Sequence, residues 1–189
     1  MGKKRIVVGI SGASGSIYAL NFLKQLKKYP EIEIHGVVSL WAWENIRLET
    51  EMTKKEVTAL FDKLYSDKDL GAAIASGSFL VDAMVIVPAS MKTVATIAYG
   101  LSDNLLSRAA DVTLKERRPL IIVPRETPLS TIHLENLTKL SQLGVQIIPP
   151  MPAFYNHPQT IQDLIDHHTM KLLDALHLRN NFDEKRWLS

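Results

Sequence analysis

Apolar and polar positions divide the chain into short strand-like runs and longer helix-like patterns. Continuous runs rich in β-branched residues predict strands buried on both faces of a sheet. The predicted strands are residues 5–10, 33–39, 83–90, 119–124 and 145–150. Apolar residues that recur every three or four positions predict helices between them. The predicted helices are residues 17–29, 41–50, 53–65, 104–117, 130–144 and 160–177, with another opening after residue 90.

The order of these elements predicts the fold and the edge of the sheet that carries a ligand site. Five strands alternating with helices predict a three-layer α/β fold, Rossmann-like or flavodoxin-like, with helices on both faces of a parallel sheet. We expect residues 1–189 to form a single domain, with residues 178–189 as a C-terminal tail that could contact a second subunit or fray. Ligands in such folds bind beyond the carboxyl ends of the strands. Those ends are residues 9–16, 39, 88–93, 124–126 and 149–155.

Two helices carry capping signals. Ser102 or Asp103 is expected to cap the helix over residues 104–117, because its side-chain oxygen can accept hydrogen bonds from the first free N–H groups. Ser130 is expected to do the same for the next helix, and Gly144 to follow its last turn.

Composition and charge exclude several classes of protein. The formal net charge of +2 is too small to indicate nucleic-acid binding by field strength. The absence of cysteine excludes disulfide and thiolate chemistry and fits a cytoplasmic location. No apolar run approaches the roughly 20 residues of a membrane helix, and the basic, then apolar N-terminus is interpreted as a strand rather than a signal peptide. The six histidines lack metal-ligand spacing, so no metal site is expected.

The loop "SGASGS" at residues 11–16 follows the first predicted strand. Gly9, Gly12 and Gly15 are three apart, which is neither the dinucleotide pattern nor a nucleoside triphosphate loop. Glycines allow close approach of a ligand, and the following helix offers free N–H groups, so the loop predicts a phosphate site. The second strand ends at Ser39 rather than at an acidic residue, which favours a mononucleotide over NAD. The alternative is an ordinary tight turn with serine caps.

A second loop rich in hydroxyl groups, residues 88–93, follows another buried strand. It contains Ser90, Lys92 and Thr93 and opens a helix. Two such loops at one sheet edge could hold opposite ends of a flavin. The alternative is a second capped turn.

Cationic residues recur in the second half of the chain. Arg108 and Lys115 are seven residues apart and share a helix face. They would be costly to bury without an anion, unless Asp111 and Glu116 pair with them. Arg125, at the end of a buried strand, could fork onto a phosphate.

Three further residues complete the candidate chemistry. Glu126 follows Arg125 and could exchange a proton with a substrate if its pKa is raised; the alternative for this pair is a surface ion pair. The proline-rich residues 149–158 form a stiff extended loop that would hold Tyr155 rigidly, or a structural crossover. Lys171 on the last helix could add charge.

Several stretches together resemble the UbiX-type flavin prenyltransferases, whose members were once described as subunits of hydroxyarylic acid decarboxylases. The resemblance extends from about residue 5 to Trp187. It is carried by "VGISGASGSIYA" (8–19), "RLET" (47–50), "SGSF" (76–79), "RAADVTLKERRPLIIVPRETPLSTIHLENL" (108–137) and "PPMPAFYNHPQ" (149–159).

The resemblance implies an activity. The family joins the dimethylallyl group of dimethylallyl monophosphate to N5 and C6 of reduced FMN, without a metal. The product, prenylated FMN, serves a UbiD-type decarboxylase. Relatives form large homo-oligomers, often dodecamers.

The resemblance also implies residue roles. It assigns FMN binding to Gly12, Ala13, Ser14, Ser39, Ser90, Met91, Lys92, Thr93 and Arg125. It assigns prenyl phosphate binding to Arg108, Lys115, Arg125, Glu126, Tyr155 and Lys171. It implies catalytic roles for Glu126, Glu49, Ser14 and Lys115.

In the implied mechanism, Glu126 carries a proton to the departing phosphate, Ser14 relays it, and Lys115 stabilises negative charge. Glu49 accepts the proton lost from C6, and Trp41 or Tyr155 shields the cavity from water. The chain departs from the family at Lys171, where many members have arginine, and at Leu40, where lysine is common.

The sequence is also compatible with two other functions. One is an FMN-dependent decarboxylase of cysteine-type substrates on a related fold, which would need a histidine base near the flavin. The other is a non-catalytic flavin-carrying subunit, which would have no use for a cluster of four cations.

Overall fold

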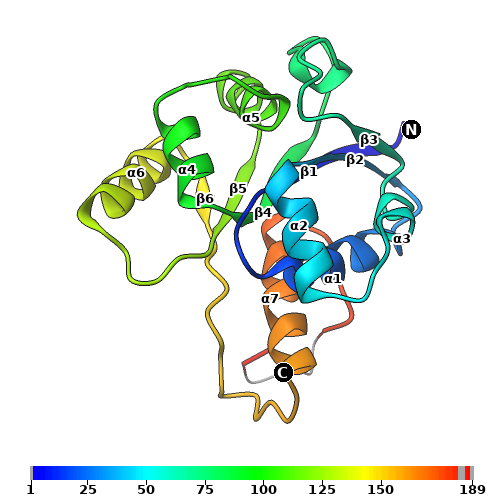
Figure 1. Cartoon of the computed structure of the whole chain (residues 1–189). Coiled ribbons are helices and arrows are strands. Elements are labelled where there is room, and N and C mark those ends of the chain that lie inside the picture. The colour runs from blue at the N-terminus through cyan, green and yellow to red at the C-terminus, as the bar shows by residue number, and fades with distance from the viewer. Residues whose placement is uncertain (1, 183–185, 188–189) are drawn as a thin grey trace.

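The computed structural model describes residues 2–182, 186 and 187. Within these residues the sheet has six parallel strands in the order β3-β2-β1-β4-β5-β6, which confirms the predicted fold class (Figure 1). The strands are β1 Lys4–Ile10, β2 Ile32–Val38, β3 Lys63–Tyr65, β4 Ala83–Ala89, β5 Leu120–Pro124 and β6 Gln146–Ile147. The chain runs outward in one direction from β1 and in the other from β4. The boundary between these two strands is therefore the switch point of a doubly wound sheet.

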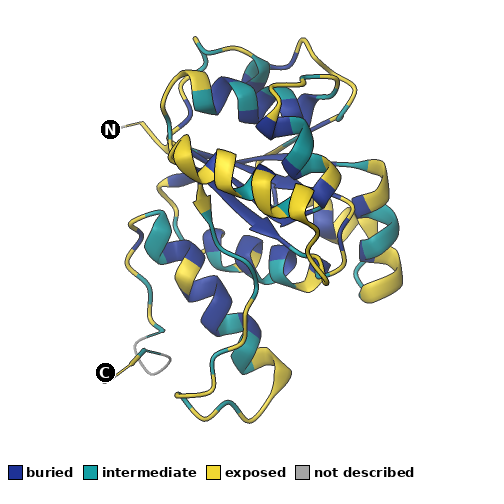
Figure 2. Ribbon diagram, turned by 90° about the vertical axis from the view of Figure 1, so that its left-hand side faces the viewer, coloured by how far each residue is buried: buried dark blue, intermediate teal, exposed yellow. Residues whose placement is uncertain are grey.

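Helices cover both faces of the sheet. They are α1 Ser16–Leu26, α2 Leu40–Glu49, α3 Lys54–Thr58, α4 Met91–Ala98, α5 Leu105–Lys115, α6 Thr131–Gln142 and α7 Ile161–Ala175, with a short 3-10 helix, η1, at Ala73–Ala75. One core contains side chains of α1, α2, α3 and α7, and the other contains side chains of α4, α5 and α6. In Figure 2 the buried strands lie between helices whose outer faces are exposed. The sheet is therefore buried on both faces, and the loops at its strand ends are anchored to this core.

The helix predicted over residues 53–65 is wrong in its second half. Helix α3 ends at Thr58, and Lys63–Tyr65 pair with β2 as an edge strand. The ring of Phe61 packs directly over Gly36 of β2. This contact, which no local pattern reports, holds the segment against the sheet and overrides its helical periodicity.

Helix caps agree with the sequence in part. Ser130 caps α6, and Gly144 follows that helix with a φ of 86°, as predicted. Helix α5 is instead capped by Asn104, whose side chain accepts a hydrogen bond from the Ser107 N–H at 2.8 Å. Neither Ser102 nor Asp103 holds that position.

Two segments leave the body of the fold near its C-terminal end. The chain after β6 runs away from the sheet beside α7 before turning back into that helix (Figure 1). The tail after α7 is described only in part, because the predicted contact segment includes residues 183–185, 188 and 189, which lie outside the described residues. Within the described residues, no helix has both the length and the apolar composition needed to cross a membrane.

Candidate functional site

The loops after β1 and β4 are tied together at the switch point. The backbone N–H of Ser90 donates a hydrogen bond to the Ser11 hydroxyl at 2.7 Å. The same hydroxyl donates to the Pro88 carbonyl at 3.1 Å, and Ser11 is buried. The two hydroxyl-rich loops that the sequence singled out are therefore neighbours, as their positions at strand ends predicted.

A cavity of about 320 Å³ opens beside these loops. Its lining residues come from the two loops, the segment after β3, helix α4 and the starts of α2 and α5. They are Ser11, Gly12, Ser39, Leu40, Trp41, Asp67, Ser90, Lys92, Thr93, Thr96, Asn104, Leu106 and Ser107. Its volume is within the range of small-molecule sites. Five of the residues predicted to bind flavin line this cavity: Gly12, Ser39, Ser90, Lys92 and Thr93.

Three helices begin at the wall of the cavity. The hydroxyl of Ser39 accepts from the Ala42 N–H at 3.2 Å, and that of Ser90 accepts from the Thr93 N–H at 3.3 Å. These serines cap α2 and α4, and Asn104 caps α5. The free N–H groups and the positive dipole ends of three helices suit a ligand that carries negative charge.

Gly12 allows α2 to approach the glycine loop closely. A Cβ atom at Gly12 would lie 2.6 Å from the Cβ of Trp41. The exposed indole of Trp41 also lines the cavity. The glycine is therefore required by the neighbouring helix, in addition to any ligand.

The N-terminus of α1, where the glycine loop was expected to hold a phosphate, is occupied by a carboxylate of the same chain. Oε2 of Glu49 accepts hydrogen bonds from the N–H groups of Gly15 and Ser16, at 2.9 and 2.8 Å. Gly15 has a φ of 107°, which a side chain would make strained. Burial alone would raise the pKa of Glu49, but hydrogen bonds from Ser16, Ser14 and Gly15 outweigh burial and lower the pKa. Because Glu49 already uses the N–H groups of α1, an anion bound at the switch point would contact the cavity and the N-termini of α2, α4 and α5.

Arg125 reaches back from β5 to the glycine loop. Its Nε donates to the Ser14 carbonyl at 3.1 Å, and its backbone N–H donates to Ala89 of β4. Glu126 is exposed beside it and accepts from the Thr127 N–H at 2.9 Å. Arg125, Ser14 and Glu49 thus form one group around the glycine loop.

The cations of α5 form a second group. Nη1 of Arg108 contacts Asp111 at 2.8 Å, and its Nε donates to the Ala75 carbonyl at 3.2 Å. Lys115 pairs with Glu116. Within one chain both cations therefore pair with Asp111 and Glu116, which was the alternative to binding an anion.

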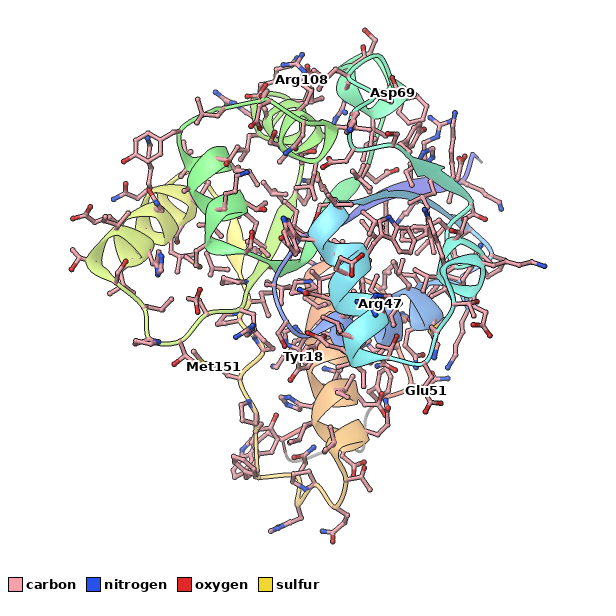
Figure 3. All side chains as sticks on the ribbon, in the orientation of Figure 1. Tyr18, Arg47, Glu51, Asp69, Arg108 and Met151 are labelled. Atoms are coloured by element: carbon pink, nitrogen blue, oxygen red, sulfur yellow. The ribbon has the colours of Figure 1, made fainter. Side chains whose placement is uncertain are left out.

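The third group is on α7 and the extended segment. Tyr155 contacts His167, and Lys171 lies one turn further along the same helix. Figure 3 shows Arg108 near the segment of Asp69, on a different side of the molecule from Met151, where the extended segment leaves the body. A single chain consequently does not gather all the predicted phosphate-binding residues at one place.

Sequence reasoning missed part of the cavity wall. Asp67 lines it and accepts from the Leu106 N–H at 3.0 Å. Burial raises the pKa of Asp67. Asn104 and Ser107 also line it. No motif marks these residues, because the fold brings them to β1 and β4 from separate segments. Of the predicted flavin residues, Ala13 in the glycine loop and Met91 at the start of α4 are buried.

Metal ligation is not suggested by the arrangement of acidic and imidazole groups. In the described part of the chain, no three such side chains come together as a possible ion site.

Comparison with known proteins gives close relatives. A family model described as Flavoprotein matches residues 1–172. The flavin prenyltransferase LpdB of Lactiplantibacillus plantarum is 67% identical over 184 residues, which cover 97% of this chain and 98% of that protein.

Solved structures agree with this likeness. A dodecameric FMN-dependent UbiX-like decarboxylase from Escherichia coli O157:H7 superposes with a TM-score of 0.96 and 46% identity, over 98% of this chain and 100% of the other. AnUbiX (PadA1), in complex with FMN and dimethylallyl pyrophosphate, gives a TM-score of 0.95 and 44% identity, over 99% and 98% of the two chains.

A more distant likeness connects the chain to peptidyl-cysteine decarboxylases. EpiD has a TM-score of 0.61 with 20% identity, over 80% of this chain and 83% of its own, which shows a shared fold alone. The identity and coverage of the closer relatives decide the family. The chain belongs to the Flavoprotein family and, within it, to the UbiX-like flavin prenyltransferases.

Proposed function

We propose that the protein joins the dimethylallyl group of dimethylallyl monophosphate to N5 and C6 of reduced FMN, making prenylated FMN. The observation that carries this proposal is the cavity at the switch point, walled by three helix N-termini, in a chain 67% identical to a flavin prenyltransferase. The resemblance of the motifs to that family supports the same reaction.

The cavity fits FMN in both shape and chemistry. Apolar surface from Trp41 and Leu106 can contact a flat ring system, while hydroxyls and helix N-termini can hold phosphate and ribityl oxygens. In this proposal Ser39, the loop of residues 90–93 and Arg125 hold the flavin, together with residues 12–14. Bound reduced FMN supplies the nucleophilic N5 and C6 atoms.

The remaining task of the protein is to help phosphate leave the allylic donor. Arg125 and Lys171 attract the phosphate, and Glu126, which is exposed beside Arg125, gives it a proton, with Ser14 as relay. The first bond would release the proton of N5, which can add to the remaining double bond of the prenyl group. Closure onto C6 would then release the C6 proton to Glu49, which its N–H donors hold ionised. Apolar and aromatic side chains such as Trp41 keep water from the reactive donor.

We further propose that a second copy of the chain completes the phosphate pocket. Arg108 and Lys115 lie apart from Arg125 in one chain, yet the family motif includes them all. A related structure is dodecameric. The exposed apolar residues Leu129 and Ile132, at the start of α6, would be covered by such assembly. In the assembled protein, α5 of one subunit supplies cations to the Arg125 and Glu126 of its neighbour.

The two other functions are less well supported. Among the described residues, no histidine lines the cavity, and a cysteine-type decarboxylase would need one there. A carrier that only holds flavin leaves Glu126 and the cations of α5 without a task. We propose a cytoplasmic site of action, with the product passed to a UbiD-type decarboxylase.

One incubation separates these functions. The protein is incubated anaerobically with reduced FMN and dimethylallyl monophosphate, and the mass of the extracted flavin is measured by mass spectrometry. A flavin carrying one dimethylallyl group supports the proposal, whereas unchanged flavin contradicts it. Parallel incubations with the diphosphate donor determine which leaving group the site accepts, and heat-inactivated protein controls for uncatalysed addition.

A further inference from the structure

Tyr155 is held by a buried histidine although it belongs to an exposed segment. Its hydroxyl lies 2.7 Å from Nε2 of His167 on α7. The two rings meet edge to face, with centroids 5.6 Å apart. The ring of Trp187 contacts the tyrosine in the same way at 5.3 Å. The position of the tyrosine is therefore set by side-chain contacts rather than by the loop alone.

His167 is buried, yet it lies beside two residues of the predicted phosphate site, Tyr155 and Lys171. It is 6% exposed and lies one helical turn before Lys171, so the two share a face of α7. Burial lowers the pKa of His167, and the charge of Lys171 lowers it further. The imidazole is consequently neutral near neutral pH and carries a single proton, on either Nδ1 or Nε2.

The chemistry of the phosphate determines which nitrogen should carry that proton. A phosphate dianion only accepts hydrogen bonds, so Tyr155 must donate its one hydroxyl proton in order to bind it. The tyrosine oxygen then has to be the acceptor in its bond with the histidine. That requires the proton of His167 to be on Nε2.

We propose that His167 is a positioning residue for the prenyl donor, in that its Nε2–H donates to the Tyr155 hydroxyl and so directs the tyrosine proton toward the donor phosphate. This inference rests on the proposed function, and it takes Tyr155 to bind the prenyl phosphate, as the resemblance to the family implies. The Nδ1–H form would instead accept the tyrosine proton and turn the tyrosine oxygen lone pairs toward an anion.

The chain offers a matched control in the next residue. His168 is also buried, at 4% exposed, and its ring meets Tyr18 edge to face at 5.1 Å. In the described part of the chain, its Nε2 has no hydrogen-bond partner. Replacing His168 therefore perturbs the same helix core without touching Tyr155.

The kinetic test compares His167→Phe, His167→Gln and His168→Phe in the flavin-loaded protein. Loss of one hydrogen bond of this kind predicts about a tenfold rise in the KM for dimethylallyl monophosphate in His167→Phe, with FMN affinity unchanged. His167→Gln keeps an N–H donor and should recover most of this loss, and His168→Phe should retain the wild-type KM. In a Tyr155→Phe background, His167→Phe should add no further rise in KM.

Three results would overturn the proposal. They are a KM for His167→Phe within twofold of wild type, an equal defect in His168→Phe, and additive effects in the double variant. A second test does not depend on turnover. In nitrogen-15 NMR of protein containing isotope-labelled histidine, the signal of His167 is identified by its absence from His167→Phe. This signal should show the proton on Nε2. A proton on Nδ1 rejects the inference even where prenyl transfer is normal, whereas absent prenyl transfer in wild type rejects the proposed function instead.

Discussion

The carboxylate of Glu49, the last residue of α2, accepts a hydrogen bond from the backbone N–H of Ser16, the first residue of α1, at 2.8 Å. This bond closes the glycine loop onto α2 and satisfies an N–H group that α1 cannot pair within itself. Because the pKa of Glu49 is lowered in the folded chain, the resulting stabilisation is present above the ordinary glutamate pKa. It is lost as the pH falls through the lowered value.

Replacing Glu49 by glutamine should affect both stability and reaction. The amide oxygen still accepts a hydrogen bond, but the loss of negative charge at the start of α1 should cost about 0.3–1 kcal/mol of unfolding free energy. Without a proton acceptor, bond formation at C6 should slow more than bond formation at N5. Thermal unfolding measures the first effect, and the absorbance spectrum of the flavin product measures the second.

The matched control is Glu51→Gln, which removes a nearby exposed carboxylate that bonds neither Gly15 nor Ser16. A normal product spectrum and rate in Glu49→Gln would rule out its role as proton acceptor.

Glu126→Gln should keep FMN bound but stall product formation. The amide cannot protonate the departing phosphate, so we expect the rate to fall roughly 100-fold or more. Stopped-flow or quenched assays of prenylated flavin measure the rate, and flavin fluorescence measures binding. Glu135→Gln, an exposed glutamate of α6, is the control. If Glu126→Gln turns over at the wild-type rate, proton transfer has another source.

Mixed oligomers test whether two chains build each site. Arg108→Ala and Glu126→Gln should each be inactive alone. Co-expressed at equal levels, they should regain about a quarter of wild-type activity, because a site between two chains is intact whenever each chain contributes its unmodified residue. Steady-state rates of purified mixed and separate proteins provide the comparison.

No recovery in oligomers verified as mixed by mass spectrometry would mean that Arg108 and Glu126 serve the same site from one chain. Arg118→Ala is unsuitable as a partner variant, since Arg118 donates to the Phe79 and Gly77 carbonyls and supports the fold.

Asp174→Asn should loosen the C-terminal tail. Both oxygens of Asp174 are bound by the guanidinium of Arg186 at 2.8 Å, and this contact lowers the pKa of Asp174. The folded pKa is depressed, so the stabilisation is present above the ordinary aspartate pKa of about 3.9 and disappears as the pH falls through the folded value.

We expect Asp174→Asn to lower the free energy of unfolding by roughly 0.5–1 kcal/mol at neutral pH, because the ion pair is partly exposed. Wild type and variant should converge in stability under strongly acidic conditions. Urea unfolding across this pH range measures the difference, and a difference that stays constant with pH would contradict the ion-pair explanation. Arg186→Lys, which keeps the charge but loses the paired geometry, should be intermediate.

The sequence was sufficient for the parts of the fold that repeat a local pattern. Runs of β-branched residues correctly predicted the central strands, and the serine at position 130 correctly predicted a helix start. Ser39 and Ser90 each follow a strand, and the parallel sheet brings both to one cavity. These predictions needed only periodicity and the direction of the strands.

The remaining features depend on contacts between distant segments. The edge strand β3 is held by the ring of Phe61 over β2, and Glu49 reaches α1 from the end of another helix. Asp67 joins the cavity wall without any motif of its own. The contact of Tyr155 with His167 requires the extended proline-rich segment, residues 149–158, to pack beside α7. The periodicity of apolar residues does not predict such contacts between distant segments.

The acidic partners of the α5 cations have a consequence for turnover. Arg108 is already paired with Asp111, and Lys115 is paired with Glu116. In the proposed function, an incoming phosphate would have to compete with these carboxylates, which stay on the same helix and its C-cap and would pair with the cations again once inorganic phosphate dissociates. Such a local exchange of anions would keep the spent leaving group from inhibiting the next cycle.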